Sequence, residues 1–139
     1  MTCLSNLIGV EFEYGGRGPN TLDCWGLVQE CYWRRHGIRL PDYRSTASPR
    51  RNAAMMAREG QKLWHPLPEI LEGSVLLIRV GRFGGHVGFV HKKTRFLQAL
   101  EGFGVIESRT HKFERQIVGA YSYVGPKQDD QGDHCLQST

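Results

Sequence analysis

The apolar pattern of this chain changes near its middle, at Pro66 and Pro68. Before these prolines, apolar residues recur at the three-and-four spacing of an amphipathic helix. After them come short runs, rich in β-branched and aromatic residues, that predict antiparallel strands over residues 74–80, 86–91, 95–100 and 117–124. Helices followed by strands indicate an α+β domain rather than alternating βαβ units.

The first predicted helix begins after Asp23, whose carboxylate suits the N-cap position, and runs to about His36. Gly37 then provides a stop signal. A second, shorter helix is predicted from Ser48 and Pro49, which fit a cap and a first turn, to Gly60.

Composition limits the chain to one domain with an ordinary core. The 139 residues are 40% hydrophobic and carry a formal net charge of +4. We expect a single domain over residues 1–126 and a polar, disordered tail over residues 127–139. No basic run is long enough to indicate a nucleic-acid partner.

The first residues and the apolar runs of the chain indicate where the protein is made. Residues 1–10 lack the basic start and unbroken apolar stretch of a signal peptide, and no apolar run reaches the roughly 20 residues of a membrane span. We therefore expect synthesis in the cytoplasm, and a substrate outside the cell would require a separate means of delivery.

Cys24 is the strongest candidate nucleophile among four irregularly spaced cysteines, which do not suggest a disulfide framework. It falls in the first turn of the predicted helix, where the helix N-terminus favours a thiolate and lowers a thiol pKa. Burial as a small apolar residue is the competing interpretation of any cysteine on a helix. We apply that interpretation to Cys31, which lies deeper in the same helix.

A nucleophilic thiol needs a base, and the base needs a polar group that holds its tautomer. Among six histidines, His86 opens a predicted strand directly after Gly84 and Gly85, where the backbone can turn closely. His36, His65, His111 and His134 are more simply solvated residues. His91, the other strand histidine, is expected on the opposite face from His86.

Hairpin geometry adds a third residue. If the strands over residues 86–91 and 95–100 pair around a three-residue loop at residues 92–94, Gly88 faces Gln98. Gln98 then shares a face with His86 and lies diagonally across from it. A two-residue loop would shift the register by one and send Gln98 to the other side.

Two other kinds of site are disfavoured. Cys24, Cys31 and His36 could in principle bind zinc, but no C-x-x-C pair is present and these positions serve the apolar helix face. The glycines at residues 15–18 lack the lysine and strand-to-helix context of a phosphate loop and predict a turn. The sequence indicates no cofactor.

The stretch Asp23-Cys24-Trp25-Gly26-Leu27-Val28, followed by His86-Val87-Gly88, resembles the NlpC/P60 family over residues 7–123. Residues 15–19 and 96–102 more narrowly resemble its phage-tail members. The resemblance implies a papain-like fold with the nucleophile helix packed on an antiparallel sheet. It also implies hydrolysis of peptide or amide bonds in peptidoglycan stem peptides, possible contacts with other phage tail proteins, and action on the cell wall from a virion tail.

In this interpretation Cys24 attacks, His86 transfers the proton, Gln98 orients the imidazole and the Cys24 N–H stabilises the oxyanion. Two positions depart from the family: Phe12 stands where a tyrosine hydroxyl is usual, and Gln98 where histidine is most common. These departures leave a catalytically weak tail-tip or wall-binding module as an alternative. An acyltransferase is a further alternative, because it would use the same Cys24 and His86 in an identical first half-reaction.

Overall fold

The computed structural model describes residues 3–42, 63–80 and 83–125. The predicted second helix and the predicted tail, with Cys135, lie outside these residues. The described part contains one α-helix, two short 3-10 helices and eight strands: η1 (Ser5–Leu7), β1 (Glu11–Phe12), β2 (Thr21–Leu22), α1 (Cys24–His36), β3 (Trp64–Pro66), β4 (Val75–Val80), β5 (Phe83–Lys92), β6 (Arg95–Leu100), β7 (Gly104–Arg109), η2 (Thr110–Phe113) and β8 (Ile117–Tyr123).

Helix α1 begins and ends where the sequence predicts. Asp23 caps it by accepting a hydrogen bond from the Gly26 N–H. Gly37 ends it in the left-handed conformation, φ 70°, and donates its N–H to the Trp33 carbonyl. Glycine is favoured there because a Cβ would strain that backbone.

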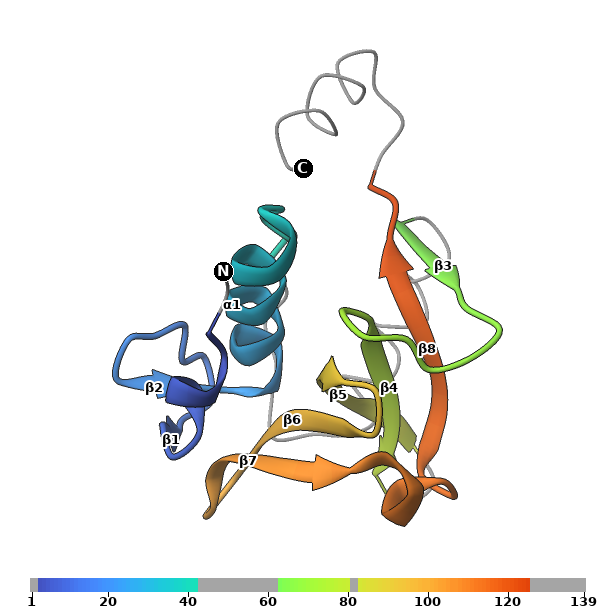
Figure 1. The fold of residues 1–139 in the computed structure, drawn as a ribbon. Helices are drawn as coiled ribbons and strands as arrows, with labels where there is room; N and C mark the ends of the chain where they lie inside the picture. The colour runs from blue at the N-terminus through green and yellow to red at the C-terminus, as the bar shows by residue number, and fades with distance from the viewer. Residues whose placement is uncertain (1–2, 43–62, 81–82, 126–139) are drawn as a thin grey trace.

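Six strands form one sheet in the order β3-β8-β4-β5-β6-β7, with antiparallel neighbours throughout. The four predicted strands correspond to β4, β5, β6 and β8, with β5 longer than expected. Strands β3 and β7 were not predicted. A separate pair, β1 and β2, is parallel and lies near the start of α1 (Figure 1).

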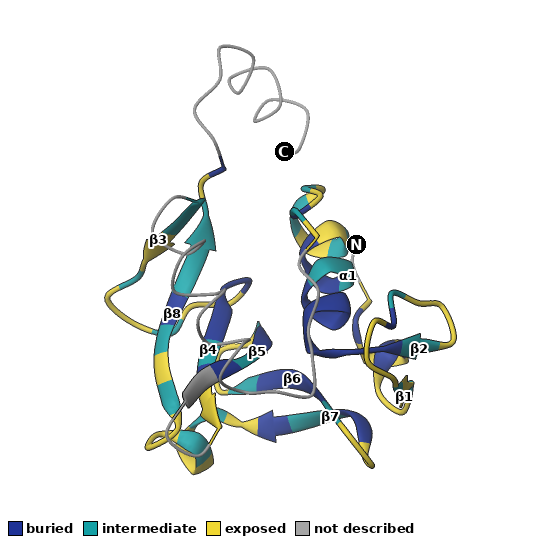
Figure 2. Ribbon diagram, turned by 180° about the vertical axis from the view of Figure 1, so that it is seen from behind, coloured by how far each residue is buried: buried dark blue, intermediate teal, exposed yellow. Residues whose placement is uncertain are grey.

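Helix α1 packs against β5 and β6, on one face of the curled sheet (Figure 1). Its buried side chains, Leu27 and Val28 among them, join Phe89 and Leu97 in the main core. The next residues along these strands, Val90 and Phe96, belong to a second cluster, because alternate strand residues face opposite sides. Figure 2 shows buried positions concentrated where α1 meets the sheet. The α+β architecture is therefore confirmed.

Candidate active site

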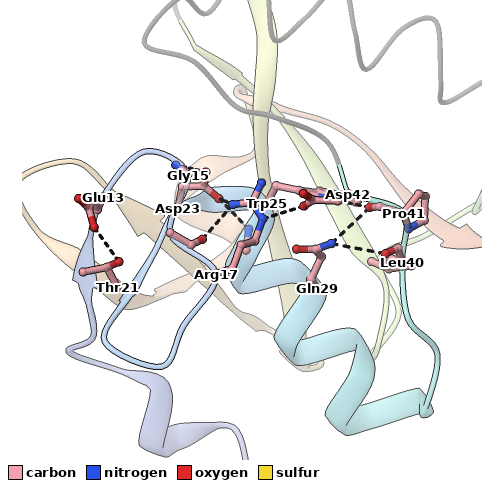
Figure 3. A network of polar contacts seen from close by, with 12 residues as sticks. Glu13, Gly15, Arg17, Thr21, Asp23, Trp25, Gln29, Leu40, Pro41 and Asp42 are labelled. Carbon is pink, nitrogen blue, oxygen red and sulfur yellow. Dashed lines mark hydrogen bonds and ion pairs between the residues drawn. The ribbon is translucent and has the colours of Figure 1, made fainter.

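A buried carboxylate organises the start of α1. Asp23 is fully buried, and its Oδ1 accepts hydrogen bonds from the Gly26 N–H and from Arg17 Nη1, each at 2.7 Å. Its Oδ2 accepts from the Gly15 N–H at 2.8 Å. Arg17 also bonds Asp42, at 2.7 Å (Figure 3). The charge of Asp23 is thus matched by directed donors, as a buried carboxylate requires.

The loop that supplies these donors lies directly against the first turn of the helix. A Cβ added to Gly26 would lie 2.2 Å from the Gly16 carbonyl oxygen. The Asp23 N–H donates to that same oxygen at 3.2 Å. The turn predicted at residues 15–18 is therefore part of the site's framework, and Arg17 is a member that the sequence analysis did not identify.

Cys24 lies in the first turn of α1 and is 6% exposed. The N–H groups of Val87 and Trp25 are directed at its sulfur. Among the described residues, pairing of β5 with β6 reaches Phe89 and Leu97 and does not extend to Val87. The thiol therefore lies at the backbone of Val87, beyond the last β5–β6 pair and one residue after His86.

The expectation of a lowered Cys24 pKa is wrong. Burial and then the charge of Asp23 raise the pKa of Cys24 from 9.0 to about 12, and the donors from Val87 and Trp25 and the charge of Arg17 only partly oppose this. Desolvation outweighs the helix N-terminus because a thiolate inside a protein loses its water. The Cys24 thiol is therefore neutral in the free protein.

His86, Gln98 and Ser108 form a hydrogen-bonded chain across three strands. His86 Nε2 lies 2.9 Å from Gln98 Oε1, and Gln98 Nε2 donates to Ser108 Oγ at 2.8 Å. The side chain of Gln98 is 1% exposed. The geometric expectation for His86 and Gln98 is thus met, while Ser108 was not identified from the sequence.

This arrangement selects a tautomer of His86. A carbonyl oxygen only accepts hydrogen bonds, so Nε2 carries the proton when it faces Gln98 Oε1. In the neutral ring Nδ1 then holds the lone pair that a general base uses. Burial lowers the pKa of His86 from its ordinary 6.5, and the bond to Gln98 opposes the shift. The ring therefore stays neutral at neutral pH.

The predicted three-residue loop is wrong, although the register it was meant to give is present. Lys92 pairs with Arg95 around a two-residue turn, and a bulge between Val90 and Lys92 restores the expected register. Phe89 consequently pairs with Leu97, which is the register that the expected alignment of Gly88 with Gln98 requires. The bulge supplies the extra residue that was assigned to the loop.

His91, the competing candidate base, lies on the opposite face as predicted. Its Nε2 is 2.5 Å from Glu107 Oε2, and Glu107 pairs with Leu97 rather than with a residue on the face of Gln98. Arg95 contacts the same carboxylate at 3.0 Å. This cluster is an ion-pair group separated from His86 by the sheet.

A tyrosine hydroxyl is present two residues after Phe12, at Tyr14. Tyr14 donates a hydrogen bond to Glu101 Oε1 at 3.1 Å. Partial burial, then the hydrogen bond to Glu101, raise the pKa of Tyr14.

The described residues contain no group of three His, Cys, Asp or Glu side chains suited to a metal ion. Within the same ranges, no helix has the length and apolar character needed to cross a membrane.

Comparison with known families identifies relatives. The NlpC/P60 family profile matches residues 9–122. The murein DD-endopeptidase/murein LD-carboxypeptidase MepS of Escherichia coli is 30% identical over 100 residues, covering 72% of this chain and 47% of that protein. A probable endopeptidase of Haemophilus influenzae is 30% identical over 102 residues, covering 72% and 56%. The chain spans about half the length of these curated relatives.

Solved structures share the fold. The NlpC/p60 domain of the peptidoglycan hydrolase SagA superimposes with a TM-score of 0.61 at 18% identity, covering 86% of this chain and 92% of that domain. NlpC2 from Trichomonas vaginalis gives a TM-score of 0.61 at 20% identity, covering 86% and 45%.

Proposed function

The chain belongs to the NlpC/P60 family, and from this premise we propose that it is a cysteine peptidase that hydrolyses bonds in peptidoglycan stem peptides. The observation that carries the proposal is the His86–Gln98 hydrogen bond of 2.9 Å, next to a thiol held at the backbone of Val87. A nucleophile, a base and an orienting group are the parts that covalent amide hydrolysis requires.

The reaction begins from a neutral pair. Cys24 Sγ attacks the amide carbonyl as its proton passes to His86 Nδ1, forming a tetrahedral intermediate. The protonated imidazole then gives this proton to the leaving amine, and a thioester remains on Cys24. Water, deprotonated by His86, hydrolyses the thioester and restores the thiol. Gln98 holds the ring throughout, and the Cys24 N–H is the proposed oxyanion donor.

The neutral starting state is supported by both pKa directions. The pKa of Cys24 is raised by burial and that of His86 is lowered by burial, so charge separation before substrate binding is unfavourable. Proton transfer must therefore accompany attack. Charge then develops mainly in the transition state, where fixed donors have their greatest effect.

The substrate class rests on the relatives. One curated relative is named a murein endopeptidase and carboxypeptidase, and one structural relative is named a peptidoglycan hydrolase. We extend that substrate class to this chain.

A finer proposal places the protein in a phage tail or with a prophage. Its support is the similarity of residues 15–19 and 96–102 to phage-tail members of the family. In this proposal the protein is made in the cytoplasm, contacts other tail proteins and reaches the wall with the virion.

A second candidate function is a wall-binding or tail-tip module with little or no turnover. The observation that favours it is the burial of Cys24, which is 6% exposed and whose thiol has a pKa raised to about 12. An acyltransferase would share the first half-reaction with the peptidase, so its products distinguish it.

Digestion of purified peptidoglycan, with soluble fragments identified by mass, tests these proposals. A peptidase releases fragments with a new free amine and a new carboxylate. An acyltransferase instead joins the acyl group to another amine. Binding to the wall without fragments would support the non-catalytic module and overturn the peptidase proposal.

A further inference from the structure

We propose that Ser108 is a positioning residue that selects the active tautomer of His86 by fixing which end of the Gln98 amide faces the ring. The catalytic consequence rests on the proposed function, whereas the effect on the tautomer does not.

Ser108 is placed for this role by the register of β7 against β6. Gln98 pairs with Ile106, so Ser108, two residues further along β7, lies on the same face and diagonal to Gln98. Ser108 is 9% exposed and Gln98 is 1% exposed. The bond of 2.8 Å from Gln98 Nε2 to Ser108 Oγ is therefore shielded from competing water.

The selection follows from the two unlike ends of a glutamine side chain. Its oxygen accepts hydrogen bonds and its NH₂ donates them. With the NH₂ on Ser108, the oxygen faces His86 and requires a proton on Nε2. A flipped amide would donate to Nε2 and leave the proton on Nδ1, which removes the base that faces away from Gln98.

Ser108 stabilises the productive orientation because a buried NH₂ without an acceptor is unfavourable. Replacing Ser108 by alanine removes that acceptor. The Gln98 amide is then free to flip, so that its NH₂ faces His86. A glutamate at position 98 has two equivalent acceptor oxygens and no NH₂. In Gln98→Glu, the tautomer of His86 should therefore no longer depend on Ser108.

Nitrogen chemical shifts of the histidine rings in the ¹⁵N-labelled 139-residue chain test the tautomer directly. His86 is assigned by comparison with His86→Gln. We expect the Nε2–H form in the unmodified protein and in Ser74→Ala, a matched control that loses a buried hydroxyl bonded to the Leu71 carbonyl. We expect a gain of the Nδ1–H form in Ser108→Ala.

Kinetics supply the second measurement. Ser108→Ala should lower kcat about tenfold or more with little change in KM, as loss of an orienting hydrogen bond typically does. In the Gln98→Glu background the same substitution should change kcat less than about threefold, since no NH₂ remains to be placed. Ser108→Thr retains a hydroxyl and should keep the Nε2–H tautomer. Ser108→Val has the shape of the threonine variant without its hydroxyl, and should gain the Nδ1–H form.

The Thr and Val pair decides the question if the alanine variant fails to fold. An Nδ1–H tautomer in the unmodified protein, or an unchanged Nε2–H tautomer in both Ser108→Ala and Ser108→Val, would overturn the proposal. If the protein shows no hydrolysis but the tautomer shifts as expected, the positioning role holds and the peptidase function fails.

Discussion

At the scale of single residues, the surroundings of Cys24 shift the pKa of its thiol in opposite directions. The helix N-terminus and the N–H groups of Val87 and Trp25 favour the thiolate. Burial and the neighbouring charge of Asp23 oppose it more strongly, and the pKa rises to about 12. In the proposed mechanism, activation of Cys24 therefore depends on substrate and on His86, and the free protein should not display a reactive Cys24.

The rates at which the cysteines are alkylated test whether Cys24 is unreactive in the free protein. Cys3 is exposed, and the hydroxyl of Ser5 lowers its pKa. Iodoacetamide near pH 7 should consequently modify Cys3 well before Cys24 and Cys31, as followed by peptide mass mapping. This order is the reverse of what the lowered Cys24 pKa expected from the sequence would give. Cys3→Ser is the control, and faster modification of Cys24 than of Cys3 would restore the original expectation.

The pH dependence of activity follows from His86. Because its pKa is lowered by burial, the ring remains a neutral base below pH 6.5, and kcat/KM should fall only at more acidic pH. The free energy of unfolding should also fall as the pH falls below 6.5. The unfolded chain then binds a proton at His86 more readily than the folded protein does, and this loss of stability continues until the pH has passed the lowered pKa.

A pH profile of kcat/KM measures the acid limb. Gln98→Glu places a carboxylate beside the ring and should move that limb to higher pH. A limb at or above pH 6.5 in the unmodified protein would contradict the buried, neutral histidine.

At the scale of elements, the sequence correctly predicted features that depend on interactions between residues close together in the chain. The bounds of α1 follow from the cap at Asp23 and the stop at Gly37, and both were identified. Strand β7 was missed because its sequence alternates little and carries Glu107 and Arg109 at a sheet edge. Its identification depends on pairing with β6, which only the folded chain provides, and Ser108 was missed with it.

The hairpin between β5 and β6 shows a second limit. Counting residues between apolar runs gave the correct register for Gln98 with the wrong turn. A three-residue loop and a two-residue turn with a bulge contain the same number of residues. Sequence spacing cannot separate them, because both return the strand to the same face.

The contact between α1 and the glycine loop gives a stability prediction. In Gly26→Ala the new Cβ would meet the backbone oxygen of Gly16, which cannot move without disturbing Asp23. The free energy of unfolding should fall by about 1–3 kcal/mol or more, as for other overpacked sites. Urea unfolding measures the loss.

Gly119→Ala is the matched control, because the nearest neighbours of its new Cβ would be side-chain atoms of Tyr121, which can turn aside. It should cost less than Gly26→Ala. An equal loss in the two variants would mean that the approach of the loop to α1 is not a tight constraint.

At the scale of the whole molecule, the proposed site draws on two parts of the fold that lie far apart in the sequence. Cys24 comes from the start of α1, whereas His86, Gln98 and Ser108 come from three neighbouring strands (Figure 1). The core between α1 and β5, with Leu27 and Phe89 fully buried, keeps the two parts together. Sequence reasoning proposed Cys24, His86 and Gln98 but not Ser108, and the burial that shifts the pKa values of Cys24 and His86 required the whole fold.

The most direct test of the central claim compares peptidoglycan fragment release by four proteins: the unmodified chain, Cys24→Ala, His86→Ala and the double variant. Circular dichroism first establishes that all four are folded. We predict fragments from the unmodified chain only, with each single variant as inactive as the double variant, because a nucleophile and its base act as a unit. Fragment release that persists in folded Cys24→Ala or His86→Ala would contradict the Cys24–His86 mechanism.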